Sequence, residues 1–331
     1  MSSPSPPSSP PALCSFSLLT LNVWFDASHA PARYAAQLEF LASLSPDVVC
    51  LQEVTQPYLD LLQAQRATLP WLAGYTLNSP TFYGSFYGTA MLVRTALAPD
   101  FSRHPFSGTE MARDLTLCRL VAPGGTAVVV GNTHLESMNT ASERAAQLEE
   151  CRALLAAQGL PAILAGDFNF CALWDYAPMQ QALGVPAPRA FVLSPLTAAG
   201  GAAVQPSSPL PPQPQQPGAA ASENASLQRT LPDFTDAWPA LHGPCTLDNP
   251  GGFTFDSCSN PMIDRPERMR YDRVLFRLPP AFALTQCSVL GRSPIGQPAA
   301  EGDGISTPKR AGPPVLLSDH FPLLAVWQVS V

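Results

Sequence analysis

Residues 162–169, AILAGDFN, show the pattern on which the fold rests, an apolar run followed at once by polar residues. The run at 162–165 is typical of a buried strand, because short apolar runs bounded by turn residues are characteristic of strands inside a sheet. Helical spacing covers 140–157 before it, and another apolar run, TAVVVGNT, occupies 126–133. This order predicts sheet strands with helices between them.

Similar apolar runs occur on both sides of this segment. They are 16–23 (FSLLTLNV), 47–53 (DVVCLQE), 88–93 (GTAMLV), 115–121 (LTLCRLV), 272–276 (DRVLF) and 323–329 (LLAVWQV). A second helical pattern covers 33–44 and ends before Pro46, because proline lacks the N–H group that a helix needs. Strands outnumber helices, which predicts a layered α/β or α+β sandwich.

Length and composition narrow the class further. The chain has 331 residues, enough for one large domain or two. An apolar share of 46% supports a sizeable core and excludes a fully disordered chain. The net charge of −7 gives no overall positive field for nucleic acid. No run of about 18 apolar residues is present, so we expect no membrane span.

The cysteines and the N-terminus bear on the compartment. Eight cysteines are scattered without a CxxC pair or a Cys/His zinc spacing. The first residues, MSSPSPP, lack the basic and apolar regions of a secretory signal. We therefore expect reduced thiols and a place in the nucleus, the cytoplasm or both.

Low-complexity segments interrupt the strand pattern. Residues 1–13 are a Ser/Pro tail that we expect to be disordered, and about 195–230 and 291–314 are rich in Pro, Gly, Ala, Gln or Ser. Strand-like runs resume after each segment. The prediction is therefore a single domain at 14–331 with two inserted loops.

Polar residues gather where the apolar strands end. Asn22, Glu53, His134, Asp167, Asn169, Asp272, Asp319 and His320 all lie in or directly beside such runs. A sheet would bring these positions together, and a buried carboxylate needs a partner or a metal ion. Carboxylate and amide oxygens without clustered Cys or His suit Mg²⁺, with Mn²⁺ as the alternative. A histidine held by a carboxylate and a spare aspartate for water complete a site for metal-assisted phosphoester hydrolysis.

Six motifs then carry a family resemblance. They are TLNV (20–23), LQEV (51–54), GNTHLES (131–137), GDFN (166–169), YDRVLF (271–276) and LSDHFPLL (317–324). In this order they resemble the endonuclease/exonuclease/phosphatase superfamily. That resemblance implies a DNase I-like, four-layered αββα sandwich with two mixed β-sheets, and Mg²⁺-dependent hydrolysis of phosphate esters.

Within the superfamily, the chain is most similar to the 5′-tyrosyl-DNA phosphodiesterases of the second type. The segment from His134 to Leu148, with the pattern HLES, ER and QL, is the sharpest part of this match. The branch removes tyrosine from a DNA 5′ phosphate during repair of topoisomerase-linked breaks. The implied partner is a DNA 5′ end, single-stranded at its terminus.

The resemblance also implies roles for single residues. The catalytic residues would be Asp167, Asn169, His320, His134 and Asp272. The metal would be held by Glu53, Asn22 and Asp319. The substrate would be bound by Arg113, Arg144, Gln147, Phe86, Tyr87, Phe255 and Tyr271.

The chain departs from the branch pattern in two places. Trp24 stands where the branch has an Asp two residues after Asn22, which leaves the outer coordination of the metal open. Phe168 stands where the branch has Thr, and Phe170-Cys171-Ala172 stand where it has Leu-Arg-Asp. The missing Arg removes one expected phosphate contact. Arginines cluster nearby, at positions 265, 268, 270, 273 and 277, either as a solvated flank of a strand or as a clamp for a nucleic-acid backbone.

Two other functions stay open. GDFN also occurs in sibling branches, so a deadenylase or RNase, a sphingomyelinase, or an inositol-phosphate phosphatase is the alternative enzyme. The run PLPPQPQQP (209–217) would suit SH3- or WW-type partners of a non-catalytic interaction module.

Overall fold

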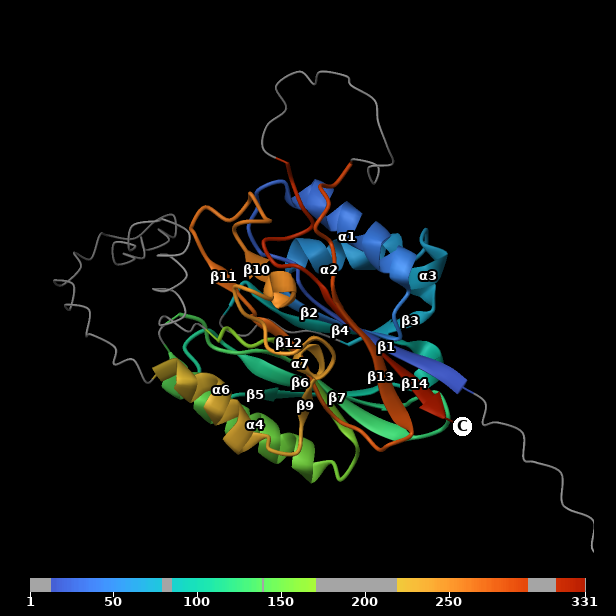
Figure 1. Cartoon of the computed structure of the whole chain (residues 1–331). Coiled ribbons are helices and arrows are strands. Elements are labelled where there is room, and N and C mark those ends of the chain that lie inside the picture. The colour runs from blue at the N-terminus through green and yellow to red at the C-terminus, as the bar shows by residue number, and fades with distance from the viewer. Residues whose placement is uncertain (1–12, 79–84, 139, 171–218, 297–313, 331) are drawn as a thin grey trace, which may run out of the picture.

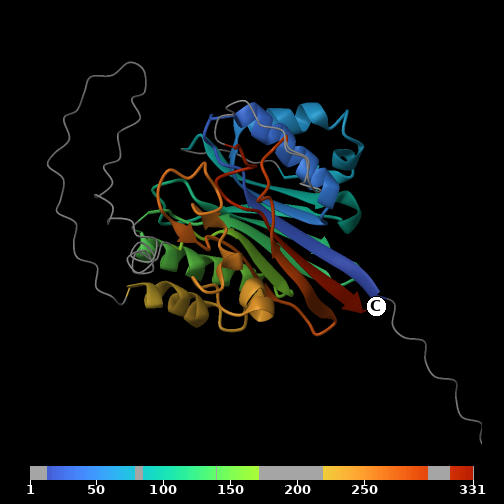
Figure 2. The same cartoon turned by 45° about the horizontal axis from the view of Figure 1, so that its top comes forward.

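The computed structural model describes residues 13–78, 85–138, 140–170, 219–296 and 314–330. Two six-stranded β-sheets lie face to face, with helices on the outside of each (Figure 1). Turning the molecule by 45° keeps the same order of layers in view (Figure 2). The predicted αββα sandwich of two mixed sheets is thereby confirmed.

The first sheet has the strand order β13-β14-β1-β2-β4-β3. Its strands are β1 (Leu13–Asn22), β2 (Val48–Thr55), β3 (Tyr75–Leu77), β4 (Tyr87–Arg94), β13 (Phe282–Val289) and β14 (Leu323–Ser330). Strands β1 and β2 are parallel, and the other pairs are antiparallel. Both ends of the described chain therefore meet in one sheet, where β1 pairs with β14.

The second sheet has the order β5-β6-β7-β8-β12-β9. Its strands are β5 (Asp100–Pro105), β6 (Asp114–Val121), β7 (Ala127–His134), β8 (Ala162–Asp167), β9 (Thr235–Asp236) and β12 (Asp272–Arg277). Strands β7 and β8 are parallel, so helix α4 between them serves as the crossover. A short pair, β10 (Phe255–Asp256) and β11 (Arg268–Met269), stands apart from both sheets.

Helices cover the outer faces of the two sheets. Helices α1 (Ala30–Leu44), α2 (Gln56–Gln65) and α3 (Pro70–Ala73) lie on the first sheet, and α4 (Ala141–Ala157) and α6 (Ala219–Thr230) on the second. The remaining helical turns are α7 (Ala237–His242), η1 (Thr95–Leu97) and η2 (Pro250–Gly252). Among the described residues, no helix is long and apolar enough to cross a membrane.

Alternation along β1 explains why this strand is apolar on both faces. Phe16 and Leu18 point into the core between the sheets, where Trp327 also lies. Leu19 and Leu21 point outward and pack in the cluster that α1 and α2 cover. Successive side chains of a strand face opposite sides, so a strand covered on both faces must be apolar throughout.

One predicted loop is wrong in part. Residues 219–230, the end of the low-complexity segment at 195–230, form helix α6, which packs on α4 with Leu227 buried. Residues 195–218, the run at 209–217 and most of 291–314 lie outside the described residues. The predicted tail at 1–13 is one residue too long, because Leu13 already belongs to β1.

A β-bulge in β2 brings the sheets into polar contact. The pairing between β2 and β4 shifts register between Leu51 and Val54. Next to this shift, the amide Nδ2 of Asn132 on β7 donates to the carbonyl oxygens of Leu51 (3.0 Å) and Ala90 (2.9 Å). Its Oδ1 accepts from Nε2 of Gln52 at 2.7 Å. Bulges redirect side chains next to active sites, and this one is held from the opposite sheet.

We expect Asn132→Leu to lower the free energy of unfolding by about 2–4 kcal/mol, because Leu51, Ala90 and Gln52 each lose a buried hydrogen-bond partner. Urea titration of the wild type and the variant measures the difference. Ser102→Ala on the edge strand β5 is the control and should change stability little. An equal stability of Asn132→Leu and the wild type would contradict this role for Asn132.

Candidate active site

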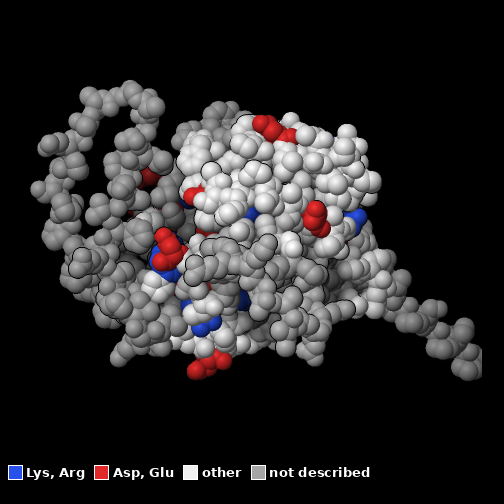
Figure 3. Space-filling view, turned by 90° about the horizontal axis from the view of Figure 1, so that it is seen from above, with Lys and Arg blue, Asp and Glu red and all other residues white. Residues whose placement is uncertain are grey.

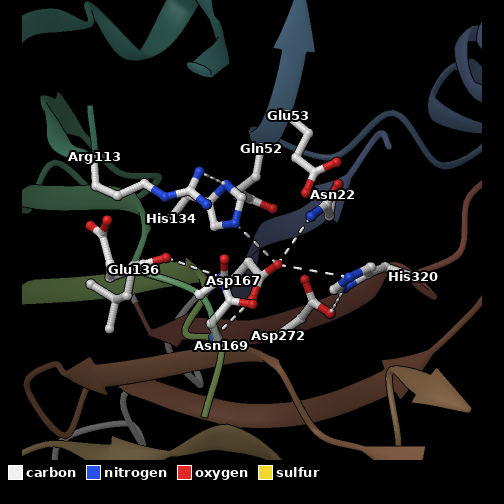
Figure 4. Close-up of polar contacts among 12 residues, drawn as sticks. Asn22, Gln52, Glu53, Arg113, His134, Glu136, Asp167, Asn169, Asp272 and His320 are labelled. Atoms are coloured by element: carbon white, nitrogen blue, oxygen red, sulfur yellow. Dashed lines mark hydrogen bonds and ion pairs between the residues drawn. The ribbon is translucent and has the colours of Figure 1, made fainter. Parts of the chain in front are cut away.

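The polar strand ends meet at one edge of the sandwich. Figure 4 shows Arg113, His134 and Glu136 on one side of Asp167, with Asp272 and His320 on the other. Asn22 ends β1, His134 ends β7 and Asp167 ends β8. Because β7 runs parallel to β8 and pairs His134 with Asp167, both side chains emerge at the same edge. The sheet order therefore assembles residues that are up to about 300 positions apart.

Asp167 lies at the centre of the site and is 1% exposed. Its Oδ2 accepts a hydrogen bond from Nδ2 of Asn22 at 3.0 Å and faces Nε2 of His134 (3.5 Å) and of His320 (3.8 Å). Its Oδ1 accepts from the backbone N–H of Asn169 at 2.9 Å. The left-handed backbone of Asn169, with φ 49°, is what turns this N–H back onto the carboxylate. Asp167 is thus a carboxylate surrounded by donors.

The two histidines differ in charge. Burial alone lowers the pKa of His320, but Asp272 and Asp167 outweigh it and raise the pKa well above the ordinary range. Nδ1 of His320 lies 2.8 Å from Oδ2 of Asp272. Burial lowers the pKa of His134 well below its ordinary value, and Arg113 and His320 lower it further. His320 is therefore a cation and His134 a neutral imidazole near neutral pH.

Arg113 decides which nitrogen of His134 carries the proton. Nη1 of Arg113 lies 2.8 Å from Nδ1 of His134. A guanidinium group can only donate, so Nδ1 must be the unprotonated acceptor. The proton of the neutral ring is then on Nε2, which faces Asp167.

The lowered pKa of His134 makes stability depend on pH. Below the ordinary value of 6.5, the unfolded state binds a proton at this position and the native state does not, so acid favours unfolding. Without divalent ions, the unfolding free energy of the wild type should fall below pH 6.5 by up to about 1.4 kcal/mol per pH unit from this group. His134→Asn should show a shallower fall in chemical denaturation between pH 7 and 5. Equal slopes would contradict the buried neutral state of His134.

Glu53 is presented to the site by the bulge in β2. Its own backbone is left-handed, with φ 56°, and its Oε2 accepts from the N–H of Phe25 at 3.0 Å. Burial and the nearby carboxylate of Asp319 raise the pKa of Glu53 to about 7. Burial also raises the pKa of Asp319. Two carboxylates that repel each other in a partly buried place are suited to share a cation.

A second group of possible metal ligands lies beside them. Ligand atoms of Asp167, Asp272 and His320 all lie within 4.8 Å of one another. His320 already supplies the positive charge in this group and is held by Asp272. The acidic pair of Glu53 and Asp319 is therefore the better fit for a divalent metal, and the side chain of Asn22 lies next to Glu53 (Figure 4).

Two residues expected to bind substrate do not reach the site. Arg144 and Gln147 on α4 are 1% and 0% exposed. Arg144 pairs with Glu223 at 2.6 Å and donates to the carbonyl oxygens of Glu136 and Met138. Gln147 bonds to the backbone and side chain of Glu136. Both therefore hold the loop after β7 from behind: Nε and Nη1 of Arg144 and Nε2 of Gln147 donate to groups of the protein itself.

The expected aromatic residues divide into two groups. Phe255 and Tyr271 are buried around His320, with ring centroids 5.1 and 5.8 Å from its imidazole. Phe86 is 56% exposed and meets the ring of Tyr87 edge-on at 5.0 Å. Tyr87 in turn lies 6.1 Å from His134. Of these four residues, Phe86 and Tyr87 are therefore the ones that offer aromatic surface at the mouth of the site.

Sequence reasoning missed Phe25, which completes this aromatic surface. Its ring stacks on Tyr87 at 4.9 Å and meets Phe86 edge-on at 5.1 Å. Phe25 is 37% exposed. Its loop is held by the buried Arg33, which donates to the carbonyl oxygens of Val23 and Ser28. Phe25 lies three positions after the end of β1, and nothing in the sequence around it indicates a place in the site. We call Phe25, Phe86 and Tyr87 the aromatic ledge.

Each arginine of the cluster pairs with a carboxylate of the protein, which disfavours a clamp for a nucleic-acid backbone. Arg268 pairs with Asp256, Arg270 and Arg273 with Asp236, Arg277 with Asp233, and Arg265 with Glu267. Their charges are thus balanced inside the fold, and most of them are largely buried. On the described part of the face seen in Figure 3, basic and acidic side chains are interspersed and form no continuous basic patch.

Comparison with known proteins places this geometry in a family. A model of the Endonuclease/Exonuclease/phosphatase family matches residues 19–320. Tyrosyl-DNA phosphodiesterase 2 of Mus musculus is 35% identical over 159 residues, which cover 46% of this chain and 40% of that protein. The Homo sapiens protein of the same name is 31% identical over 160 residues, covering 46% and 42%. The match spans less than half the length of these relatives.

Solved structures resemble the chain over nearly its whole length. The structure of D. rerio TDP2 complexed with single-stranded DNA product has a TM-score of 0.65 at 19% identity, covering 95% of this chain and 98% of that chain. Truncated Caenorhabditis elegans TDP2 has a TM-score of 0.62 at 21% identity, covering 95% and 97%. At these identities the likeness supports the fold.

Proposed function

Because the chain belongs to the endonuclease/exonuclease/phosphatase family, we propose that it is a Mg²⁺-dependent phosphodiesterase that releases tyrosine from a DNA 5′ phosphate. The observation that carries the hydrolytic part is the carboxylate of Asp167 between the neutral His134 and the cationic His320. The relatives' names and the DNA product bound in the D. rerio structure support the nucleic-acid part. Repair of topoisomerase-linked breaks, in the nucleus or the cytoplasm, would be its setting.

Side chains of the site are suited to bind a phosphate group. Within the described part of the chain, no carboxylate pairs with Arg113, which is 5% exposed with Nε left without a partner. A buried cation without a counter-ion favours an anionic ligand. Nε2–H of His134 and Nε2–H of His320 can donate to phosphate oxygens.

Asp167 acts as the general base in this proposal. It accepts a proton from water while the water oxygen forms a bond to phosphorus and the ester P–O bond breaks. A phenol has a pKa of about 10, so tyrosine leaves more easily than an alkyl alcohol and needs less help from a general acid. When bound by Glu53 and Asp319, Mg²⁺ would supply positive charge to a phosphate oxygen.

The aromatic ledge supports an aryl substrate end. Its rings form a continuous path from the exposed Phe86 through Tyr87 to His134. Arg113 lies over the ring of Tyr87 at 5.3 Å, so the phosphate-binding cation and the ledge adjoin. Flat rings stack on such surfaces with a gain of about 1–3 kcal/mol. This arrangement favours a phosphate ester whose leaving group or terminal base is aromatic.

A substrate panel tests the proposal. With Mg²⁺ present, the protein should release tyrosine from an oligonucleotide with a 5′-phosphotyrosine faster than it degrades polyadenylate, sphingomyelin or an inositol phosphate. Preference for one of the last three would keep the hydrolytic chemistry and reject the tyrosyl-DNA substrate.

Phe86→Ala should reduce kcat/KM for the phosphotyrosyl oligonucleotide by about 10-fold, since a stacking partner of about 1–3 kcal/mol is lost. For a 5′-methyl phosphate ester of the same oligonucleotide, the same substitution should reduce kcat/KM by a smaller factor. Leu241→Ala, an exposed apolar residue on α7, is the matched control. An equal reduction of kcat/KM for both esters would show that the aromatic ledge does not contact the leaving group.

A further inference from the structure

Arg113 stands at the end of a segment without regular structure. Residues 106–113 connect β5 to β6; residues 107, 108 and 110 are exposed, and Phe106 and Arg113 at the two ends are buried. Ala112, directly before Arg113, has a left-handed backbone with φ 56°. That conformation costs a non-glycine residue about 1–2 kcal/mol, so the backbone here must be held by other contacts.

Glu136 supplies those contacts from beneath the segment. Its Oε1 accepts from the backbone N–H groups of Glu110 (3.0 Å) and Met111 (2.8 Å). Its Oε2 accepts from the hydroxyl of Thr109 (2.9 Å) and from Nε2 of Gln147 (3.0 Å). Glu136 itself is 0% exposed. Breaking the hydrogen bonds of a fully buried carboxylate is costly. The positions of the groups that donate to it are therefore well defined.

The contacts continue to Arg113 itself. Oγ1 of Thr109, which donates to Glu136, also accepts the backbone N–H of Arg113 at 2.8 Å. The guanidinium of Arg113 then reaches Nδ1 of His134. Glu136 does not take part in the contacts around Asp167, and it lies away from that carboxylate in Figure 4.

We propose that Glu136 is a positioning residue. By holding residues 109–111, it sets the guanidinium of Arg113 against Nδ1 of His134 and keeps the ring proton on Nε2, facing Asp167. The effect of this arrangement on turnover rests on the function proposed above, whereas the position of the proton does not. Gln147 belongs to the same arrangement, which gives the HLES and QL parts of the sequence pattern a shared structural purpose.

The test compares Glu136→Gln with Glu150→Gln. An amide at position 136 keeps one acceptor but turns its NH₂ group toward the donors of Thr109 and Gln147. Glu150 is the matched control, because its carboxylate also binds this segment, at the N–H and hydroxyl of Ser107, without reaching residues 109–113. The full chain is labelled with ¹⁵N-histidine, and the His134 signals are identified by their loss in His134→Asn.

Long-range ¹H–¹⁵N spectra distinguish the two neutral forms of imidazole. Wild type and Glu150→Gln should show His134 with Nε2 protonated and Nδ1 bare. Glu136→Gln should show a mixture of both forms. A folded Glu136→Gln protein with the wild-type His134 pattern would overturn the proposal. If Glu136→Gln does not fold, Thr109→Val, which removes the hydroxyl link alone, decides the question by the same readout.

Activity separates the inference from the proposed function. Misplacing a group at the reacting centre by about 1 Å can cost about 10²-fold, so kcat of Glu136→Gln should fall by about that factor, with Glu150→Gln unchanged. If the spectra change as expected but the wild type hydrolyses no phosphodiester, the function fails and the positioning stands.

Discussion

Asp167→Asn is expected to lower kcat by about 10³–10⁴-fold with little change in KM, because the amide cannot accept a proton from water. The substitution is nearly isosteric, and Asp167 is almost fully buried. Removing a buried charge should leave the fold intact or make it slightly more stable. Release of tyrosine from a 5′-phosphotyrosyl oligonucleotide gives the rate, and thermal unfolding gives the stability.

The matched control for this variant is Asp233→Asn. Asp233 pairs with Arg277 at the far end of β12 and is half exposed, so its loss should leave turnover unchanged. Activity of Asp167→Asn within about 10-fold of the wild type would remove Asp167 from the role of general base.

Glu53→Gln should abolish Mg²⁺ binding at millimolar concentrations and reduce turnover by about 10³-fold, since the site loses one of its two paired carboxylates. Calorimetric titration with Mg²⁺ measures the affinity directly. The rise in melting temperature that Mg²⁺ gives the wild type should also disappear. Glu39→Gln, on the exposed face of α1, is the control.

The pH dependence of Mg²⁺ binding sharpens this prediction. Burial and Asp319 raise the pKa of Glu53 to about 7. Protons therefore compete with the metal, and the apparent affinity of the wild type should fall as the pH drops below about 7. Undiminished Mg²⁺ binding by Glu53→Gln would place the metal elsewhere, with Asp167, Asp272 and His320 as the next candidate group.

The sequence was sufficient for the layers and for most of the central site. Strands covered on both faces leave long apolar runs, so β1, β2, β7 and β8 could be located within a few residues. Scarce polar residues at the ends of such runs are conspicuous, which is why Asp167 and the two histidines could be proposed together. Parallel neighbours such as β7 and β8 then bring those ends to one edge.

Roles that depend on where a side chain points could not be predicted. Arg144 belongs to the same motif as His134, but its side chain on α4 pairs with Glu223 on α6 and does not point into the site. The spacing of residues along a helix shows which of them share a face. What covers that face of α4 is shown only by the packing of α6 on it. The composition of 219–230 is poor in large apolar residues, so the helix there depends on contacts such as Arg144 with Glu223.

The role of the arginine cluster could not be predicted from its charge either. Five arginines within 13 residues resemble a basic surface, but carboxylates from distant parts of the chain balance them. Asp236 alone pairs with both Arg270 and Arg273. Only the pairing of β9 with β12 brings Asp236 beside these arginines.

The central claim is that the centre around Asp167 cleaves the phosphotyrosyl bond at a DNA 5′ end with the help of a divalent metal. The most direct measurement follows tyrosine release from a 5′-phosphotyrosyl oligonucleotide by the purified protein in Mg²⁺, with and without EDTA, beside Asp167→Asn. We expect rapid release by the wild type that stops with EDTA and is nearly absent in the variant. No release by a folded wild-type protein in Mg²⁺, or release that continues in EDTA or in Asp167→Asn, would contradict it.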